Sequence, residues 1–358
     1  MFLGGGLMSR EGTPLERVVT AFNIGVPDRV PVFNVGGVSR KVIGVKLLDM
    51  MRNPDVQAKA QLAAYRRIGH DSVSIGVDVA VEPEALGCKI KFSEDAQPMV
   101  IEPLIKVPED VDKLRIPDPE KDGRMPVNIK AARMLLDEVG DVVDVSAWVM
   151  GPFSLAALIR GSEFFKDLIR RPEMAHKMLK TLMQCQKVYS KGFLDEGVRT
   201  ICMPDPSASP NLISPKFYNT FALPYEIELF TYLKKRGVRV FLHICGDTTL
   251  ILEDMAKSGA NCLSIDQPPD LAYAKEKVGH KVCLHGNVRT VNTLLTGKPA
   301  EVEREARECI LKAAKGGGYM LGSSCDFPPM TPIENIEAMV RAAKKYGKYA
   351  SDGSLLST

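Results

Sequence analysis

Two kinds of apolar pattern alternate along the chain from residue 29 onward. Short apolar runs rich in β-branched residues predict buried strands, and longer segments with an apolar residue every three or four positions predict helices. The predicted strands span residues 29–35, 71–78, 142–150, 198–203, 238–244, 261–266, 281–287 and 319–325. Strands that alternate with helices over 358 residues predict a parallel (β/α)8 barrel. A doubly wound open sheet is the alternative, but no Gly-x-Gly-x-x-Gly motif follows the first strand.

Two segments depart from this alternation. Residues 13–23 have one apolar face and predict a helical extension outside the main core. Residues 79–127, which are rich in proline and charged residues, predict an excursion after the second strand rather than a separate domain. We therefore expect a flexible N-terminus over residues 1–12, a single barrel domain over 13–350 and a flexible tail over 351–358.

Composition narrows the class of protein. A formal net charge of +3 argues against nucleic-acid binding, and no apolar run reaches the roughly 18 residues of a membrane helix. The cysteines form no Cys-x-x-Cys pair, which is typical of a protein in the reducing cytoplasm. We expect His70, His176 and His280 to lie at the surface. Six cysteines are expected to pack in the interior, namely Cys88, Cys185, Cys202, Cys262, Cys283 and Cys309.

The stretch from Val238 to Thr249 carries the first chemical signal. Its apolar strand ends on His243 and Cys245, which point to the same side because they are two residues apart. The carboxyl end of a parallel strand is where barrel enzymes place their active sites. One imidazole and one thiolate suit zinc, although a packed cysteine beside a core histidine is the other interpretation of the same pattern.

Other polar residues are predicted at the same mouth. Asp78, Asp205, Asp266, Asn287 and Cys325 end or follow five of the other strands. His243, Cys245 and Cys325 with Asp266 as a displaceable oxygen ligand would form a four-coordinate zinc site. Such a site lowers the pKa of a bound thiol, and alkyl transfer to sulfur follows naturally. Asp78 and Asp205 serve equally well as helix caps or as supports for the ligands.

Several motifs, in this order along nearly the whole chain, resemble those of the uroporphyrinogen decarboxylase superfamily. Within it, the chain is similar to zinc methyltransferases of the methylcobamide:coenzyme M methyltransferase type. The matching segments are 151–156, 205–210, 242–246, 263–266, 286–288 and 328–335, together with Cys325. The resemblance implies that His243, Cys245 and Cys325 bind zinc, with the exchangeable carboxylate at Asp266. A similar order of ligands occurs in cobalamin-independent methionine synthase.

Two departures from the family pattern affect the expected substrate. The arginine-rich signature of the decarboxylase is absent, since residues 31–40 contain a single arginine, Arg40. Asp78 nevertheless resembles the essential aspartate of that enzyme. Around Cys325 the sequence is Ser-Ser-Cys-Asp-Phe, where coenzyme M enzymes tend to have Pro-Gly-Cys-Gly. Related proteins demethylate aryl ethers or methylamines, so the resemblance leaves the methyl acceptor and the direction of transfer open.

We therefore expect a cytoplasmic zinc methyltransferase. It would move a methyl group between a corrinoid (methylcobamide) protein, docked at the barrel mouth, and a thiol such as coenzyme M, a methyl ether or a methylamine. The residues expected to contact substrate or corrinoid are Asp78, Asp205, Ser207, Ser209, His285 and Asn287. The alternatives are a metal-free decarboxylase and a catalytically idle barrel that binds a corrinoid or tetrapyrrole.

Overall fold

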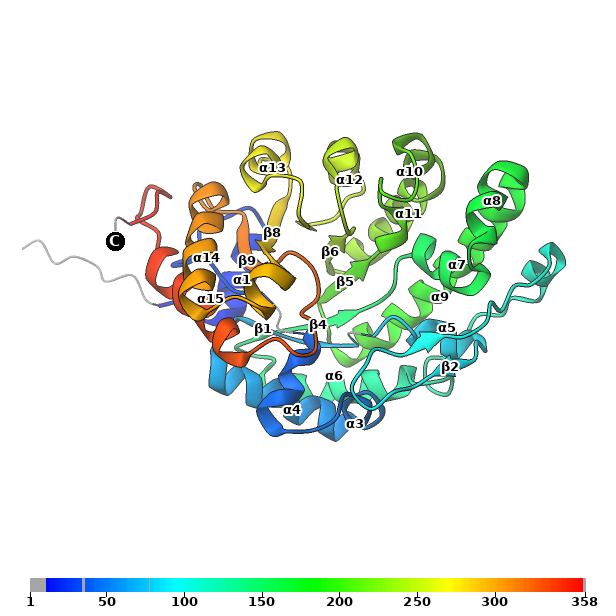
Figure 1. Cartoon of the computed structure of the whole chain (residues 1–358), viewed down its shortest axis with the longest axis horizontal. Coiled ribbons are helices and arrows are strands. Elements are labelled where there is room, and N and C mark those ends of the chain that lie inside the picture. Colours follow the sequence, from blue (N-terminus) through cyan, green and yellow to red (C-terminus); the bar gives the residue numbers. More distant parts are fainter. Residues whose placement is uncertain (1–10, 34–35, 77, 357–358) are drawn as a thin grey trace, which may run out of the picture.

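A parallel sheet with helices packed around it forms the framework of the protein (Figure 1). The structure is a computed structural model that describes residues 11–33, 36–76 and 78–356. Its seven-stranded sheet has the order β1-β4-β5-β6-β7-β8-β9, and every neighbouring pair is parallel. The strands are β1 (Ser72–Ile75), β4 (Asp144–Trp148), β5 (Thr200–Pro204), β6 (Arg239–His243), β7 (Cys262–Ser264), β8 (Cys283–Val288) and β9 (Tyr319–Ser323). Seven of the predicted strands are thereby confirmed, with ends shifted by a few residues.

The helices connect successive strands, as expected for parallel pairing. They are α1 (Pro14–Phe22), α2 (Arg40–Ile43), α3 (Leu47–Arg52), α4 (Pro54–Ile68), α5 (Val81–Leu86), α6 (Met125–Val139), α7 (Pro152–Arg160), α8 (Glu163–Arg170), α9 (Pro172–Glu196), α10 (Pro215–Phe221), α11 (Leu223–Lys234), α12 (Leu252–Lys257), α13 (Leu271–Val278), α14 (Pro299–Ala313) and α15 (Ile333–Tyr346). The α4 helix illustrates the local rules: Asn53 caps its first N–H groups, and Pro54 occupies the first turn.

The first predicted strand, residues 29–35, is the exception, because its described part forms isolated bridges instead of a strand. Val32 makes a parallel bridge with Leu321 of β9, and the Phe33 N–H donates to the Leu321 carbonyl at 3.1 Å. On the other side, the Asp71 N–H donates to the Val32 carbonyl at 2.8 Å, just before β1. Pro31 has no N–H to donate, which limits regular pairing here. Residues 34–35 lie outside the described part of the chain.

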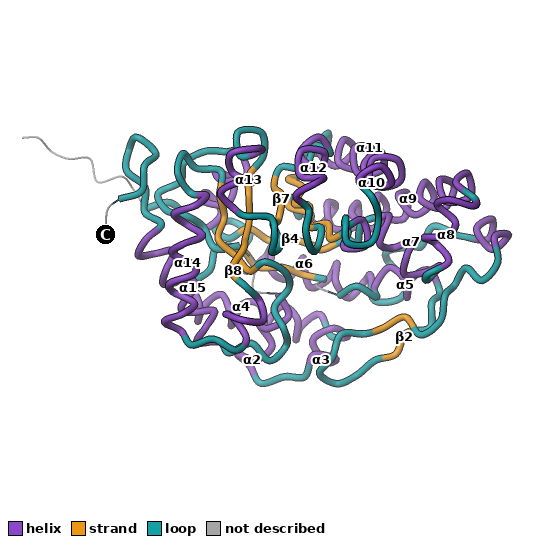
Figure 2. The backbone as a smooth tube through the Cα atoms, turned by 45° about the horizontal axis from the view of Figure 1, so that its top comes forward, coloured by secondary structure: helices purple, strands orange, loops and turns teal. Residues whose placement is uncertain are grey.

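The predicted excursion contains α5 and a small antiparallel hairpin, β2 (Ile90–Lys91) and β3 (Met99–Val100). Figure 2 shows this hairpin at the periphery, away from the parallel sheet. The hairpin loop carries Gln97, which reaches back to the carboxyl ends of the strands. The excursion therefore contributes to the mouth without adding a strand to the main sheet.

The α1 helix was predicted to lie outside the main core, and this prediction is wrong. Its Val18 and Phe22 are buried in one cluster with inward-facing residues of β5 to β9. Figure 1 shows α1 beside β8 and β9. An amphipathic pattern identifies a face to bury but not the surface that receives it. Here the helix closes the amino-terminal end of the sheet interior.

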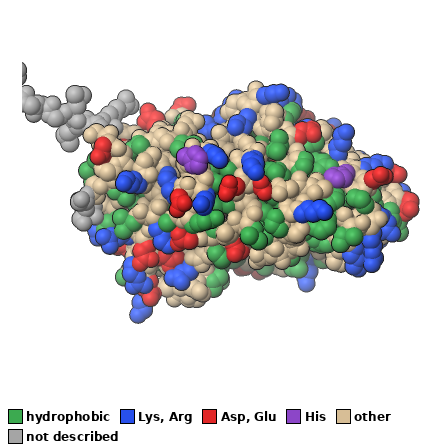
Figure 3. Space-filling model, turned by 90° about the horizontal axis from the view of Figure 1, so that it is seen from above, with side chains coloured by type: hydrophobic (Ala, Val, Ile, Leu, Met, Phe, Trp, Pro, Cys, Tyr) green, Lys and Arg blue, Asp and Glu red, His purple; other side chains and the backbone are tan. Residues whose placement is uncertain are grey.

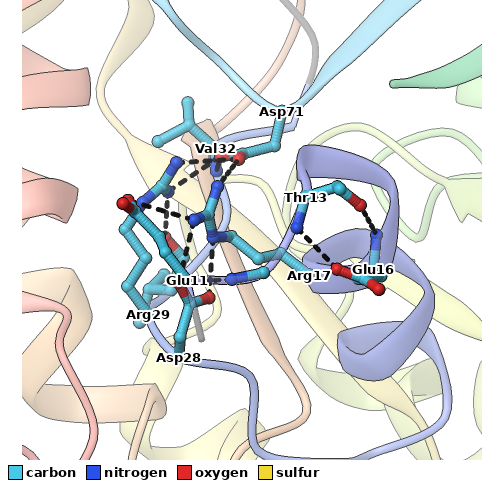
Figure 4. A network of polar contacts seen from close by, with 10 residues as sticks. Glu11, Thr13, Glu16, Arg17, Asp28, Arg29, Val32 and Asp71 are labelled. Atoms are coloured by element: carbon cyan, nitrogen blue, oxygen red, sulfur yellow. Dashed lines mark hydrogen bonds and ion pairs between the residues drawn. The ribbon is translucent and has the colours of Figure 1, made fainter. Parts of the chain in front are cut away.

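A buried ion-pair network holds α1 and the bridging segment against β1 (Figure 4). Asp71 is fully buried and accepts hydrogen bonds from Arg29 at 2.8 and 2.9 Å and from the Val32 N–H at 2.8 Å. Arg17 of α1 contacts Asp71 at 3.3 Å and Asp28 at 2.7 Å. Because buried charges need partners, these contacts fix where α1 docks.

The mixture of acidic and basic side chains on the surface is consistent with the formal net charge of +3. On the face in Figure 3, Lys and Arg side chains are interspersed with Asp and Glu side chains. Within the described residues, no helix has both the length and the apolar character required to cross a membrane.

His70 was expected at the surface but is fully buried, where burial lowers its pKa to about 3. Of the predicted termini, residues 1–10 and 357–358 lie outside the described part of the chain.

Candidate metal centre

Three donor atoms converge at the carboxyl ends of β6 and β9. His243 is the last residue of β6, Cys245 follows two positions later, and Cys325 follows the end of β9. The His243 Nε2 lies 3.3 Å from the Cys245 Sγ, which lies 3.7 Å from the Cys325 Sγ. All three donor atoms lie within 4.8 Å of one another. Although β6 and β9 are not neighbours in the sheet, its curvature brings Cys325 to Cys245.

This spacing fits a zinc ion. Zinc bonds of about 2.3 Å to sulfur and about 2.0 Å to nitrogen place tetrahedral ligands about 3.5 to 3.8 Å apart. The observed separations of 3.3 and 3.7 Å lie close to these values. One imidazole and two thiolates form a soft donor set, which favours zinc over magnesium or calcium.

A chain of hydrogen bonds behind His243 sets which ring nitrogen faces the two cysteines. The Ser264 Oγ lies 3.0 Å from the His243 Nδ1 and 3.1 Å from the His285 Nδ1. The His285 Nε2 lies 3.4 Å from the Phe33 carbonyl, which can only accept. Burial lowers the pKa of His285 to about 3, so the ring is neutral and donates through Nε2. The Ser264 hydroxyl then donates to His285 and accepts from the His243 Nδ1–H, which leaves the His243 Nε2 lone pair free for a metal.

Ser264 was not identified from the sequence, because a serine inside a strand carries no local signature. Gly322 was also missed, because a glycine inside a strand does not show from the sequence alone which side chain it accommodates. A Cβ atom at Gly322 would lie 1.9 Å from the His285 Nε2, so only glycine leaves room for this imidazole. Register could have suggested Ser264, since His243, Ser264 and His285 are aligned across β6, β7 and β8.

We predict that Ser264→Ala weakens metal binding by about 10- to 100-fold, the usual effect of losing a partner that orients a ligand. Competition for zinc with a chromophoric chelator measures this change. Ser146→Ala is a matched control, since Ser146 is a buried strand serine that donates to the Val73 carbonyl at 3.3 Å. Wild-type zinc affinity in the Ser264 variant would show that the hydrogen-bond chain does not orient His243.

The two thiols of the cluster are not equivalent. The hydrogen bond from Cys245 lowers the pKa of Cys325 well below its usual value, and the same contact raises the pKa of Cys245. The contact therefore favours the thiolate form of Cys325 over that of Cys245. The remaining six cysteines are buried and free, which confirms their predicted packing role.

Asp266, the predicted fourth ligand, lies outside the three-residue group among the described residues. Its Oδ2 accepts from the Gly246 N–H at 2.7 Å, and its Oδ1 accepts from the Gln267 N–H at 2.7 Å. The carboxylate thus holds the loop that carries Cys245. Its role as a displaceable ligand stays a prediction.

The structure separates the other predicted contact residues into two groups. Asp78 and His285 line the cavity beside the cluster. Asp78 is nevertheless paired with Arg124, and its Oδ1 accepts from the Ala80 N–H at 2.8 Å. The remaining four do not line this cavity: Asp205, Ser207, Ser209 and Asn287.

Local hydrogen bonds explain these four positions. Asp205 is fully buried and accepts from the Ser154 N–H at 2.6 Å, so it caps the start of α7. The Ser207 N–H donates to the Ser154 Oγ, and the Ser209 Oγ accepts from the Asn211 N–H. Asn287 donates to the Asp266 carbonyl at 3.2 Å. Their polar groups stabilise the loops of the mouth, which favours the helix-cap interpretation of Asp205, and contact of these residues with substrate or corrinoid stays a prediction.

A cavity of about 150 Å³ lies beside the metal-ligand cluster at the carboxyl ends of the strands. His243, Cys245 and Cys325 form part of its wall. Its floor contains Phe33 and Phe241, whose stacked rings are 5.2 Å apart. A ligand in this cavity would therefore lie next to the donor atoms.

Comparisons with known proteins identify the family of the chain. Residues 13–346 match the family model described as uroporphyrinogen decarboxylase (URO-D). The methylcobamide:CoM methyltransferase MtbA of Methanosarcina mazei is 32% identical over 341 residues, which cover 94% of this chain and 99% of MtbA. A methylated-thiol–coenzyme M methyltransferase of the same organism is 30% identical, with 94% of this chain and 91% of the relative covered. A solved structure described as a methyltransferase from Methanosarcina mazei superposes with a TM-score of 0.86 at 29% identity, covering 94% of this chain and 99% of that chain. The chain therefore belongs to the uroporphyrinogen decarboxylase family, and its similarity to the methyltransferases of that family extends over nearly its whole length.

Proposed function

We propose that this protein is a zinc-dependent methyltransferase that moves a methyl group between a corrinoid and a small thiol or methylated compound. The observation that carries the proposal is the convergence of the His243 Nε2 and the Sγ atoms of Cys245 and Cys325 within 4.8 Å beside a cavity. The similarity to methylcobamide:CoM methyltransferases supports the reaction class.

Each residue of the site has a defined task in this proposal. His243, Cys245 and Cys325 would hold the metal, and the contact of Ser264 with the His243 Nδ1 would orient the ring so that Nε2 faces the metal. Zinc bound there would lower the pKa of a substrate thiol and so supply a thiolate near neutral pH. The apolar cavity would exclude water and position the substrate sulfur near the three ligands.

The loops after the strands offer a surface for a corrinoid-carrying partner protein. Exposed apolar side chains stand on five of the segments that follow the strands, and a docked partner would cover them. They are Val79, Leu212, Leu250, Val291 and Met330, with exposed fractions of 40 to 73%. A partner docked on this surface would present its corrinoid to the cavity.

The finer architectural predictions belong to the same proposal. We infer that residues 29–33 complete a (β/α)8 barrel, since they hydrogen-bond to β9 on one side and to Asp71 before β1 on the other. Residues 13–350 would then act as one catalytic domain, working in the cytoplasm.

A metal-free decarboxylase of a multi-carboxylate substrate has less support. Carboxylates are held by Arg and Lys side chains, often in bidentate pairs. Among the described residues that line the cavity, none is Arg or Lys. A metal-free decarboxylase would also leave the convergence of the His243, Cys245 and Cys325 donor atoms unexplained.

The test is methyl transfer from methylcobalamin to a thiol by the zinc-loaded protein. Loss of methylcobalamin absorbance and mass spectrometry of the thioether follow the reaction. In each turnover the cobalt–carbon bond breaks, a carbon–sulfur bond forms, the thiol proton passes to water and cob(I)alamin keeps the electron pair. We expect transfer to stop when zinc is removed with a chelator and to return when zinc is restored. Failure with both 2-mercaptoethanol and benzyl mercaptan, or undiminished transfer without zinc, would contradict the proposal.

A further inference from the structure

The cavity beside the metal-ligand cluster has aromatic walls. Phe33, Trp148, Phe241 and Phe327 line it, and the Trp148 and Phe241 rings meet edge to face with centroids 6.1 Å apart. An apolar protein cavity of about 150 Å³ accommodates one benzene ring. The volume of about 150 Å³ found here therefore suits a substrate body of ring size.

The charges around the cavity exclude an anion. None of the described lining residues is Arg or Lys. Arg124, which pairs with the lining residue Asp78, also pairs with Glu84 at 2.6 Å, so two carboxylates match its single charge. The other charged side chain of the lining, Asp326, is also a carboxylate. A sulfonate or carboxylate buried in this cavity would have no positive side chain to pair with, which is strongly unfavourable.

Two buried polar atoms at the cavity have no hydrogen-bond partner among the described residues. The Trp148 Nε1–H has no acceptor, and the Gln97 Oε1 has no donor. Both residues line the cavity, from β4 and from the β2–β3 hairpin respectively. Buried polar groups are normally hydrogen-bonded. A ligand that offers both an acceptor and a donor, as a hydroxyl group does, would supply the kinds of partner that these atoms lack.

We propose that the small substrate of this site is an uncharged compound with an apolar body of ring size and one hydroxyl-like polar group, and that small anions are rejected. The inference rests on the proposed methyltransferase function for the identification of the cavity as the substrate site. It distinguishes this chain from an enzyme whose substrate carries a sulfonate.

Trp148 is the only tryptophan of the chain, so its fluorescence reports directly on the cavity. Three benzyl probes with a neutral, an anionic and a cationic head group test the inference: benzyl alcohol, phenylmethanesulfonate and benzyltrimethylammonium. Each is titrated into the full-length protein while tryptophan emission is recorded at excitation wavelengths that the probes do not absorb. We expect a saturable change with benzyl alcohol, and at least about tenfold weaker binding of both ions, because an unpaired buried charge is costly.

Equal or tighter binding of phenylmethanesulfonate would overturn the inference, as would tighter binding of benzyltrimethylammonium or the absence of any response. Gln97→Lys adds a cation on the hairpin, outside the metal-ligand cluster, and should improve phenylmethanesulfonate binding at least about tenfold by pairing its charge. An unchanged affinity in this variant would show that shape, and not charge, excludes the anion. The titrations need no methyl transfer, so the wrong order of affinities overturns the substrate class alone. Absence of transfer from methylcobalamin overturns the proposed reaction instead.

Discussion

Cys325→Ser is expected to lose the bound zinc and to lower methyl transfer by more than about 100-fold, beyond the effect of losing a supporting residue. A serine hydroxyl is a poor zinc ligand near neutral pH, whereas the Cys325 thiol is already biased toward its thiolate by the hydrogen bond from Cys245. Metal content by mass spectrometry and the methylcobalamin assay measure the two losses on the same preparation.

Cys309→Ser provides the matched control for this experiment. Cys309 is a buried free cysteine outside the metal-ligand cluster, and its Sγ donates to the Asn287 Oδ1 at 3.6 Å, so serine keeps a donor group at this position. This variant should retain about one zinc per chain, as expected for a closed set of ligands. A Cys325→Ser protein with the zinc content of the control would remove Cys325 from the ligand set.

Asp71→Asn is expected to lower the free energy of unfolding by about 3–5 kcal/mol, the cost of leaving a buried charge without its partner. The amide keeps the shape of the carboxylate but not its charge, so Arg29, which is 7% exposed, would lose its charged partner. Arg17, which is 5% exposed, would keep only Asp28 and the exposed Glu11. The midpoint of chemical denaturation, followed by circular dichroism, measures the change.

Asp195→Asn is the control for this second variant. Asp195 pairs with Lys191 at 2.5 Å on the surface of α9, where both side chains are about 60% exposed. Exposed pairs contribute roughly 0 to 1 kcal/mol, so this variant should unfold close to the wild type. Similar denaturation midpoints for the two variants would show that the Asp71 network does not anchor α1.

The framework of this protein was largely predictable because its strands are buried on both faces. Uninterrupted apolar runs such as residues 238–242 are typical of parallel sheets, and they located β4 to β9 within a few residues. The bridging segment 29–33 was harder, since Pro31 removes a ladder donor and its pairing depends on residues far away in the chain. The docking of α1 and the burial of His70 likewise depend on tertiary packing that no local pattern encodes.

The same distinction between local sequence patterns and tertiary packing applies to the residues of the candidate site. His243 and Cys245 were identified because their spacing within one strand is a local property. The approach of Cys325 depends on the curvature of the whole sheet, which brings the ends of β6 and β9 together. Three residues of the cavity were not identified from the sequence, namely Ser264, Trp148 and Gln97. Their roles depend on the folded arrangement of the strands and the β2–β3 hairpin around the cavity. The sequence left two roles open for Asp205, because it places this residue at the mouth but does not show which way the side chain faces.

The position of α1 has a kinetic consequence for the proposed reaction. This helix fills the amino-terminal end of the sheet interior, and the cavity lies at the opposite end, among the loops offered to the corrinoid protein. The small substrate and the partner would then share one entrance. We expect compulsory-order kinetics, in which the small molecule binds first, the partner covers it, and the methylated product leaves only after the partner has dissociated.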